Sequence, residues 1–346
     1  MNLDSKEIKN FYNLLKESGL VDETELHLKV DLDTSLIAIA AIDKANKGPA
    51  LGGTRCIHYA SIKDAIIDAL KLSKTMTRKI QFADLPFTGG KVVLVKPDKI
   101  SNKKEYFSAY GKFIDSLDGR IITGCDSGVT QEDMKIATEY TKYITALPSA
   151  NSDLDSLAYL TAFGVQEAMR AAIQFKFGKD NLKNIKIVIQ GVGKVGAELV
   201  AILCEHGADL TVTDTDSKKL SLIYSQYNVR SVDPDKIYQI ESDVFAPCGL
   251  GGTINSKTIP SLKDKIICGA ANNPLASEDI SQYFDKLGIL YVPDFIANIG
   301  GTVYAALSYQ GHSSEQAKDW LSKFLYQKTL QSLHHRDCYN HIYTAA

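Results

Sequence analysis

The chain has 346 residues, a length that predicts two domains. With 45% hydrophobic residues, 23% charged residues and a formal net charge of -2, it lacks the basic surface expected of a nucleic-acid-binding or membrane-surface protein. No apolar run reaches the ~20 residues of a membrane span, and residues 1–15 are charged and helical in pattern rather than a signal segment. The six cysteines show no CxxC spacing, which argues against a zinc site and predicts a cytoplasmic protein without a bound metal.

A helix is predicted over residues 61–80, because apolar residues recur there at helical spacing. Ser61 stands where a hydroxyl can cap the first turn. Lys79 falls in the last turn, where the helix dipole favours a cation. From position alone, Lys79 is either a surface lysine of this kind or part of a site.

Lys91 follows Gly89 and Gly90, which clear space beside it, and precedes a buried strand over residues 92–95. Apolar neighbours and the ammonium group of a second lysine would both disfavour the charged form of Lys91 and lower its pKa. Lys91 could therefore act as a general base near neutral pH. Asp126 precedes a turn-forming Ser-Gly pair that could hold its carboxylate in an open cleft. Taken singly, Lys91 could equally extend its amine to solvent, and Asp126 could cap a turn.

The second half of the chain alternates short strands with helical or turn-rich crossovers. A helix is predicted over residues 158–176. Five nearly unbroken apolar strands follow, at residues 185–190, 209–214, 242–247, 265–270 and 289–294. This repetition is typical of a parallel, doubly wound sheet, so the predicted fold class is α/β.

The polar stretch 148–156 is the expected boundary between the two domains. We expect a first α/β domain over residues 1–147 and a Rossmann-type domain over residues 148–319. Helical sequence continues over residues 302–333. We expect the segment 320–346 to return to the first domain.

The motif 191-GVGKVG-196 lies between the first of these strands and a helix, a context that predicts a dinucleotide-binding turn. Gly191 permits the tight turn, Gly193 lets the backbone approach a pyrophosphate, and Gly196 lets the helix pack on the sheet. The remaining residues of the turn are Val192, Lys194 and Val195. The alternative is an ordinary connection between a strand and a helix that binds no nucleotide.

Asp214 ends the next strand, at the distance from the turn where an acid accepts the adenosine ribose hydroxyls. A carboxylate at this point repels a 2′-phosphate, so NAD is favoured over NADP. Lys218 and Lys219 lie close by in the sequence and weaken that preference.

Together these segments resemble the amino-acid dehydrogenases of the glutamate/leucine/phenylalanine/valine family, most closely its leucine, phenylalanine and tryptophan branch. The resemblance extends over residues 30–306. It is carried by 48-GPALGGTR-55, 76-MTRK-79, 89-GGKVV-93, 123-TGCDSGVT-130, 191-GVGKVG-196, 244-VFAPCGLGGTIN-255, 269-GAANNPL-275 and 293-PDFIANIGG-301. The family implies a substrate-binding and oligomerisation domain followed by a Rossmann-type NAD domain.

The matching positions imply roles for residues of this chain. Lys91 is implied to be the general base, Asp126 a proton shuttle, and Lys79 the group that binds the substrate α-carboxylate. The other implied substrate-binding residues are Leu51, Gly52, Met76, Gly124, Asn273, Thr302 and Ala305. Besides the glycine turn and Asp214, the implied cofactor-binding residues are Thr161, Cys248, Asn272 and Asn298.

The implied reaction is reversible oxidative deamination, in which an L-amino acid, NAD and water give a 2-oxo acid, ammonium and NADH. Gly124 stands where the family's leucine enzymes carry alanine, and Thr302 and Ala305 stand where they carry larger aliphatic residues. Smaller walls leave more room, so the resemblance implies a bulky or aromatic hydrophobic substrate rather than valine. It also implies a homo-oligomer, from dimer to octamer.

One alternative is a non-catalytic sensor that binds nucleotide or amino acid and descends from such an enzyme. Two departures from the family pattern favour it. Residues 157–159 replace a proline-containing stretch, and Ile299 replaces a small residue beside Asn298. A 2-hydroxy-acid dehydrogenase is disfavoured, because neither His58 nor His206 adjoins a recognisable site motif.

Overall fold

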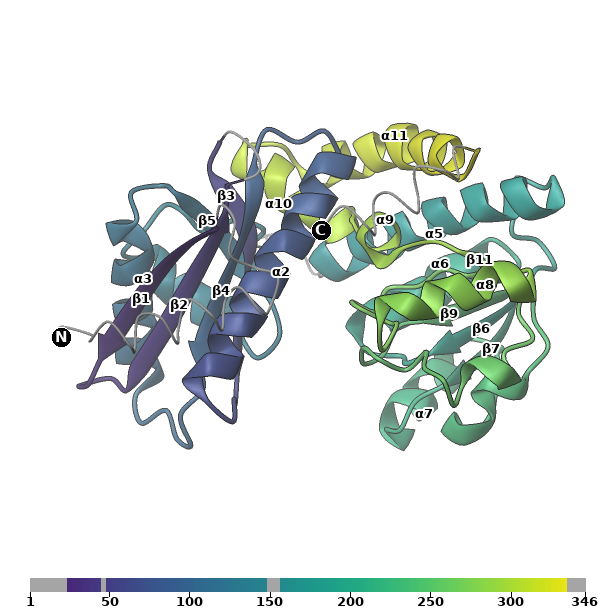
Figure 1. The fold of residues 1–346 in the computed structure, drawn as a ribbon, viewed down its shortest axis with the longest axis horizontal. Helices are drawn as coiled ribbons and strands as arrows, with labels where there is room; N and C mark the ends of the chain where they lie inside the picture. The colour runs from purple at the N-terminus through teal and green to yellow at the C-terminus, as the bar shows by residue number, and fades with distance from the viewer. Residues whose placement is uncertain (1–23, 45–47, 148–155, 335–346) are drawn as a thin grey trace. The chain divides into compact units, whose positions relative to one another are not determined.

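The computed structural model describes residues 24–44, 48–147 and 156–334, which belong to two compact units (Figure 1). The first unit extends to Ser152 and includes Ala305–Gly311, and the second holds Asp153–Tyr304 and the chain from His312 onward. The predicted helical segment 1–15 and nearly all of the predicted boundary 148–156 lie outside the described residues. In the described ranges, no helix combines the length and the apolar character needed to cross a membrane.

The first unit is built on a mixed five-stranded sheet with the order β1-β2-β4-β3-β5. Its strands are β1 (Thr24–Asp31), β2 (Leu36–Asp43), β3 (Ala50–Ile57), β4 (Thr88–Val95) and β5 (Ile121–Cys125). Strand β3 pairs in parallel with both β4 and β5, whereas β2 runs antiparallel to β1 and β4. The carboxyl ends of β4, β3 and β5 therefore lie along one edge of the sheet.

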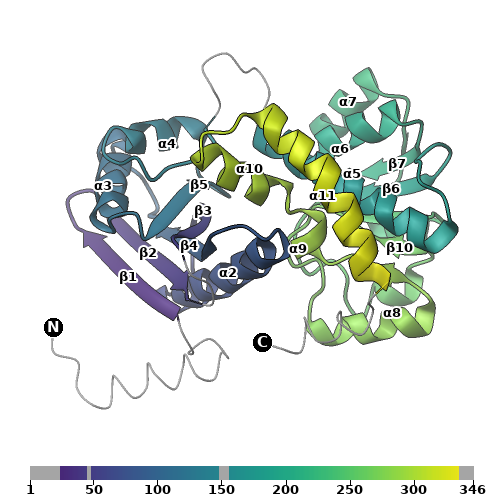
Figure 2. The same cartoon turned by 90° about the horizontal axis from the view of Figure 1, so that it is seen from above.

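Helices cover both faces of this sheet (Figure 2). They are α2 (Ile62–Phe82), α3 (Lys103–Ser116) and α4 (Gln131–Thr138). Alternate residues of β2 point to opposite faces, so that Ile39 and Ala41 pack against α2 while Ala38 and Ala40 pack against α3 and α4. Because both of its faces are buried, β2 is apolar from Leu36 to Ile42, whereas the edge strand β1 alternates polar and apolar residues and is partly exposed.

The start of α2 agrees with the sequence-based expectation, whereas the start of β4 does not. The Ser61 side chain accepts a hydrogen bond from the Asp64 backbone N–H at 3.2 Å, which confirms the predicted cap of α2. Strand β4 begins at Thr88 rather than at residue 92, so Lys91 lies inside the strand and not before it. The two preceding glycines suggest a loop, but pairing with β3 and β2 holds them in extended conformation.

The second unit has a parallel six-stranded sheet with the order β11-β10-β9-β6-β7-β8, which confirms the predicted α/β fold with a Rossmann-like second domain. Its strands are β6 (Lys186–Gln190), β7 (Asp209–Thr213), β8 (Arg230–Ser231), β9 (Val244–Pro247), β10 (Ile266–Ile267) and β11 (Leu290–Tyr291). The two-residue β8 is the strand that the sequence pattern missed.

Helices and 3-10 turns precede, connect and follow these strands. They are α5 (Ser156–Phe177), α6 (Lys194–Glu205), α7 (Ser217–Gln226), η1 (Pro234–Gln239), η2 (Ile259–Ser261), η3 (Glu278–Ile280), α8 (Ser281–Leu287), α9 (Asp294–Ala297), α10 (Gly300–Tyr309) and α11 (Ser314–His334). One face of the sheet packs on η1, η2, η3 and α8, and α5 packs against α6 and β10.

Helix α11 packs along α5 within the second unit, whereas the segment 320–346 was expected to return to the first domain. The buried residues of α11 recur every four positions, at Ala317, Leu321, Leu325, Thr329 and Leu333, and form the mostly apolar stripe that such packing requires. The segment that belongs to the first unit is instead Ala305–Gly311, the second half of α10 and the turn after it. Residues 335–346 lie outside the described part.

Asp264 is a buried carboxyl group in the second unit, with only 2% of its surface exposed. Ser242 donates a hydrogen bond to Oδ1, and within the described residues Oδ2 has no hydrogen-bond partner. Burial therefore raises the pKa of Asp264 to about 6. Because the folded state holds this proton more tightly than the unfolded chain, the group stabilises the fold at low pH and ceases to do so as the pH passes 6.

We predict that the Asp264→Asn variant gains stability relative to the parent protein between pH 4 and pH 7, by on the order of 3 kcal/mol. The gain arises because asparagine has no proton to lose. Urea unfolding at each pH can be followed by the fluorescence of Trp320, the single tryptophan, which lies on α11 in the same unit. A stability difference that stays constant over this pH range would contradict the assignment.

Candidate active site

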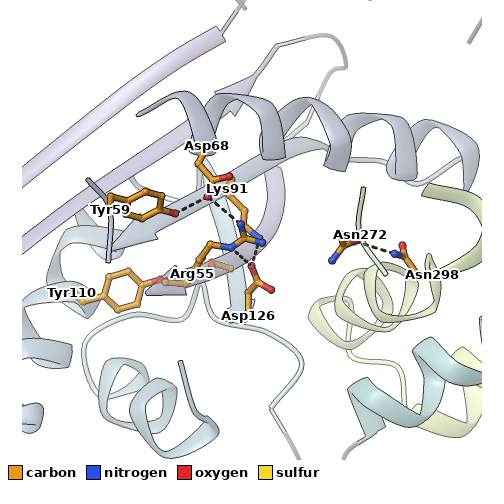
Figure 3. A network of polar contacts seen from close by, with 10 residues as sticks. Arg55, Tyr59, Asp68, Lys91, Tyr110, Asp126, Asn272 and Asn298 are labelled. Atoms are coloured by element: carbon orange, nitrogen blue, oxygen red, sulfur yellow. Dashed lines mark hydrogen bonds and ion pairs between the residues drawn. The ribbon is translucent and has the colours of Figure 1, made fainter. Parts of the chain in front are cut away.

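Lys91 and Asp126 form an ion pair in the first unit, with Lys91 Nζ at 2.5 Å from Asp126 Oδ2 (Figure 3). Lys91 extends from the middle of β4 and is 6% exposed, and Asp126 follows directly after β5. Burying either charge alone would be costly, so each makes the burial of the other tolerable. The pair that the sequence predicted from two separate motifs is therefore brought together by the fold.

Strand β3 lies between β4 and β5, and its glycines allow the pair to meet across it. Thr54 pairs with Val92 on one side and with Cys125 on the other, so Gly53 lies level with Lys91. A Cβ added at Gly53 would stand 2.9 Å from Asp126 Cβ. The missing side chain thus leaves room for the carboxylate to lean over β3 toward the lysine.

The ionised form of Asp126 is stabilised by its surroundings. Burial favours the neutral acid, but the positive charges of Lys91 and Arg55 and a backbone hydrogen bond from Ser127 outweigh it, and the pKa of Asp126 is held far below its usual range. Asp126 is therefore a permanent anion at neutral pH and an acceptor for the Lys91 ammonium.

Arg55, Asp68 and Tyr59 extend this cluster, although the sequence indicated no role for any of them. Arg55 Nε lies 3.4 Å from Asp126 Oδ2, and Arg55 Nη1 donates to Asp68 Oδ2 at 3.1 Å (Figure 3). The Tyr59 hydroxyl donates to the same oxygen of Asp68 at 2.6 Å. The sequence could have pointed to Arg55, because a charged arginine on a buried strand, here within the motif 48-GPALGGTR-55, is uncommon without a partner.

Lys79 and Met76 lie on the last two turns of α2. Lys79 is 7% exposed, which excludes the surface lysine that its position at the helix end had left open. Met76 is half-buried. The helix that carries both residues is set against β4 by Thr77, whose hydroxyl accepts from the Gly89 N–H at 3.1 Å and donates to Asp43 at 2.6 Å.

The sequence suggested that Gly89 and Gly90 clear space beside Lys91, but the structure shows a different use for them. A Cβ added at Gly89 would stand 2.1 Å from the Ser73 carbonyl oxygen of α2, and one at Gly90 would stand 2.9 Å from Ala50 Cβ of β3. The two glycines instead let α2 and β3 approach the backbone of β4.

Several predicted substrate-binding residues meet in the first unit. Leu51 and Ala305 belong to one apolar cluster, which also contains Ile80, Phe87, Ile122 and Ala306. A Cβ at Gly52 would overlap the Gly90 carbonyl oxygen, so Gly52 serves close strand packing. A Cβ at Gly124 would lie 3.0 Å from the Thr145 carbonyl oxygen, and the Thr145 hydroxyl donates to the Ala305 carbonyl at 2.8 Å. Thr145 is thus a neighbour of both predicted pocket positions that the sequence did not indicate.

Thr302, Asn273 and Thr161 belong to the second unit. Thr302 is buried on α10, and the hydroxyl of Thr161 on α5 donates to the Leu157 carbonyl at 2.7 Å. Asn273 is exposed and has a positive φ of 47°, a conformation that asparagine tolerates better than most residues. Its backbone N–H donates to Asp294 Oδ2 at 2.8 Å, which fixes the turn that presents its side chain.

The glycine turn of the second unit has the expected context, since it joins β6 to α6. Gly191 has a φ of 98°, and Gly193 immediately precedes α6, whose first residues are Lys194 and Val195. A Cβ at Gly196 would stand 2.1 Å from the Gly191 carbonyl oxygen, whereas one at Gly193 would meet no atom within 4 Å. Gly196 therefore serves packing, and Gly193 borders open space.

Asp214 braces this turn from the end of β7. Its Oδ2 accepts from the Val192 N–H at 2.8 Å, and its Oδ1 accepts from the Asp216 N–H at 2.9 Å. The backbone of the turn and the neighbouring strand are therefore joined through one carboxylate. The sequence predicted the position of this acid but not its contact with Val192.

Three further predicted cofactor residues follow β9, β10 and α9. The Cys248 thiol is buried, which raises its pKa to about 12, so it stays protonated. The Asn298 amide donates to Asn272 Oδ1 at 2.9 Å and to the Ala270 carbonyl at 3.1 Å (Figure 3). Asn298 is 4% exposed, and among the described residues its Oδ1 has no hydrogen-bond partner. An unsatisfied, buried amide oxygen marks a place where a ligand donor would be stabilised.

The two departures from the family pattern are residues 157–159 and Ile299. Residues 157–159 lie in the first turn of α5 rather than in a rigid loop. Ile299, which lies between α9 and α10 in the sequence, is fully buried.

Comparisons with known proteins agree on one family. The description "Glu/Leu/Phe/Val dehydrogenase, dimerisation domain" matches residues 22–143, and "Glutamate/Leucine/Phenylalanine/Valine dehydrogenase" matches residues 211–346. A leucine dehydrogenase of Bacillus subtilis is 40% identical over 88% of this chain and 84% of its own length. A phenylalanine dehydrogenase of Bacillus thermotolerans is 38% identical over the same shares. The crystal structure of L-tryptophan dehydrogenase from Nostoc punctiforme superposes with a TM-score of 0.76 at 34% identity, over 93% of this chain and 92% of that one.

We predict that Gly89→Ala destabilises the protein by about 3 kcal/mol, because the new methyl group meets the backbone of α2. Gly124→Ala in the same sheet is the matched control, since its methyl group needs only a small shift of Thr145. Thermal unfolding of the two variants measures the difference. If Gly89→Ala keeps the parent stability and loses only substrate affinity, then Gly89 does clear space for substrate.

Proposed function

The chain belongs to the Glu/Leu/Phe/Val dehydrogenase family of amino-acid oxidoreductases, and from this premise we propose that it catalyses the reversible, NAD-dependent oxidative deamination of a hydrophobic L-amino acid. The products are the 2-oxo acid, ammonium and NADH. The observation that carries this proposal is the buried contact of Lys91 Nζ with Asp126 Oδ2.

The proposed roles follow from the charges of these two groups. Bound NAD would supply the acceptor for the hydride of the substrate Cα. The amino acid, with its amino group already deprotonated, would become an iminium ion by losing that hydride. Lys91, after losing its ammonium proton, removes a proton from water as the water attacks the iminium carbon. Asp126 remains ionised beside Lys91, so it accepts hydrogen bonds from the protonated lysine rather than acting as the proton shuttle that the resemblance implied. The Lys91 ammonium passes its proton to the amino group, and Lys91 then takes the proton of the hydroxyl group as ammonia leaves and the 2-oxo acid forms. Lys79 binds the substrate carboxylate.

The proposed substrate side chain is bulky or aromatic. Small residues at three predicted pocket positions, Gly124, Thr302 and Ala305, support this assignment, because a pocket's preference follows the volume that its walls leave. The neighbouring walls of the first unit, Leu51 and the residues clustered with it, are apolar and suit a hydrophobic side chain. The named activities of the relatives range from leucine to phenylalanine and tryptophan, and the proposal favours the larger two.

The residues of the second unit fit a dinucleotide. The open space at Gly193, at the N-terminus of α6, suits a pyrophosphate, which backbone N–H groups and the helix dipole would stabilise. Asp214 would bind the adenosine ribose beside Cys248. Asn298 Oδ1, which has no hydrogen-bond partner among the described residues, would accept a hydrogen bond from the nicotinamide end. Asn272, which accepts from the Asn298 amide, and Thr161 are the other residues of the proposed site.

We propose further that the protein is a homo-oligomer whose subunits meet through the first unit. The matched description of residues 22–143 as a dimerisation domain supports this. Strand β1 is an edge strand, and its Leu28 and Val30 are 59% and 50% exposed, as expected for a strand that another subunit covers.

We predict NADH formation when the protein is mixed with NAD and phenylalanine or tryptophan at alkaline pH, with lower kcat/KM for valine and none for glutamate. The Lys91→Ala variant should lose kcat by roughly 100- to 10,000-fold, because the general base is gone, while NAD still binds. Lys96→Ala, which removes an exposed lysine just after the same strand, is the control and should keep its activity.

Two results would distinguish the alternatives. A protein that binds NAD yet turns over no amino acid of the panel would be a sensor rather than an enzyme. Full activity in Lys91→Ala would refute the role of this lysine while leaving the family membership untouched.

We predict that Gly193→Ala folds with a Tm within about 2 °C of the parent but binds NAD at least tenfold more weakly, because the new methyl group points into the space assigned to the pyrophosphate. Gly196→Ala should instead lower the Tm, because its methyl group meets the Gly191 carbonyl. Differential scanning calorimetry and isothermal titration with NAD measure both effects. Unaltered NAD affinity in Gly193→Ala would place the cofactor elsewhere.

A further inference from the structure

Arg55 lies between two carboxylates on the helix α2 side of the first sheet. Its strand, β3, is the one between the strand of Lys91 and the strand that leads to Asp126. One side of its guanidinium faces Asp126 through Nε, and the other donates to Asp68 through Nη1. Figure 3 shows the guanidinium between these two acids. Because Nε and Nη1 belong to one rigid plane, the guanidinium fixes the separation of the two carboxylates.

Asp68 and Tyr59 hold the side of the Arg55 guanidinium that faces away from Asp126. Asp68 lies on α2, and it accepts from both Arg55 and the Tyr59 hydroxyl through the same oxygen, Oδ2. Tyr59 follows β3 in the connection to α2. The side chains of Arg55 and Asp68 are 18% and 27% exposed, so both contacts are largely shielded from solvent. Arg55 is therefore anchored independently of Lys91 and Asp126.

The charges of the cluster balance only when Arg55 is present. Lys91 and Arg55 provide two positive charges, and Asp126 and Asp68 provide two negative ones. Burial lowers the pKa of Arg55, but the two carboxylates more than compensate and raise it, so the guanidinium never loses its charge. When Lys91 gives up its proton, Arg55 is the cation that still neutralises Asp126.

We propose that Arg55 is a positioning residue of the dehydrogenase reaction, which keeps the Asp126 carboxylate ionised and in place while the charge of Lys91 changes. Asp68 and Tyr59 hold the far side of the guanidinium. The inference rests on the proposed roles of Lys91 and Asp126. It adds a third charged group, Arg55, to the pair of Lys91 and Asp126.

The first test compares Arg55→Met, which keeps the length without the charge, with Arg55→Lys, which keeps the charge without the planar fork. We expect kcat to fall by roughly 10- to 100-fold in Arg55→Met, with KM for the amino acid changed by less than about threefold. The ascending limb of kcat against pH should move to higher pH, because the variant removes a positive charge from the site. Arg55→Lys should restore the position of this limb but only part of kcat.

Arg170→Met is the matched control. Arg170 also pairs with a buried carboxylate, Glu167, at 3.1 Å, but it lies on α5 in the second unit. This variant should keep the kcat and the pH limb of the parent. A purely structural loss in Arg55→Met would reduce the fraction of active protein without moving the limb. A kcat within about twofold of the parent, or an unmoved limb, would overturn the proposal.

A second measurement does not depend on turnover. The Asp126 carboxyl carbon can be followed by NMR during a pH titration of the full chain, with Asp126→Asn identifying the signal. Arg55→Met should raise the pKa of Asp126, because one of the two cations that lower it is gone. An unchanged titration would overturn the proposal. If the parent protein shows no turnover, the proposed function fails, while this titration still decides whether Arg55 holds Asp126.

Asp68→Asn provides the test if Arg55→Met fails to fold. The substitution leaves Arg55 in the chain but removes the negative charge that anchors its outer nitrogen. We expect kcat to fall by about three- to tenfold, less than in Arg55→Met, with KM for the amino acid nearly constant. An unchanged kcat in folded Asp68→Asn would contradict the anchoring role.

Discussion

The ion pair between Lys91 and Asp126 is the constraint on which the first unit depends. A buried ammonium needs a counter-charge, and here the partly buried carboxylate that provides it follows a strand that is not a neighbour of β4, with β3 between them. The pair can form because Gly53 has no side chain to separate the two groups. Arg55, two residues farther along the same strand, then provides the second positive charge. The strand between the two partners therefore contributes both the space and the counter-charge.

The parallel arrangement of strands explains where the candidate residues gather. In the first unit, Asp126 follows the carboxyl end of β5. In the second unit, the glycine turn follows β6, Asp214 follows β7, Cys248 follows β9, and Asn272 comes after β10. In a parallel sheet these ends share one edge, where loops are free to bind ligands without disturbing the core. Residues from distant parts of the sequence thus meet because of strand direction.

Glycines have two different uses in this protein, and the structure separates them. At Gly89 and Gly196 an added Cβ would strike backbone at 2.1 Å, so these positions let a helix approach a strand or a turn. At Gly193 an added Cβ would meet nothing, so this position leaves the turn open. The residue type is glycine in both cases, so the sequence does not distinguish the two uses. The difference lies in what stands opposite the missing side chain, which only the folded chain defines.

The sequence by itself determined the α/β class, the parallel second sheet, the cap at Ser61 and the family, because these rest on periodicity, turn residues and motifs that are local in the chain. It also identified Lys91 and Asp126 as candidates. Their contact, the extension of β4 back to Thr88, and the packing of α11 on α5 were decided only by the tertiary structure. So was the cluster of Arg55, Asp68 and Tyr59, because an arginine is accepted on a buried strand only where carboxylates from other elements face it.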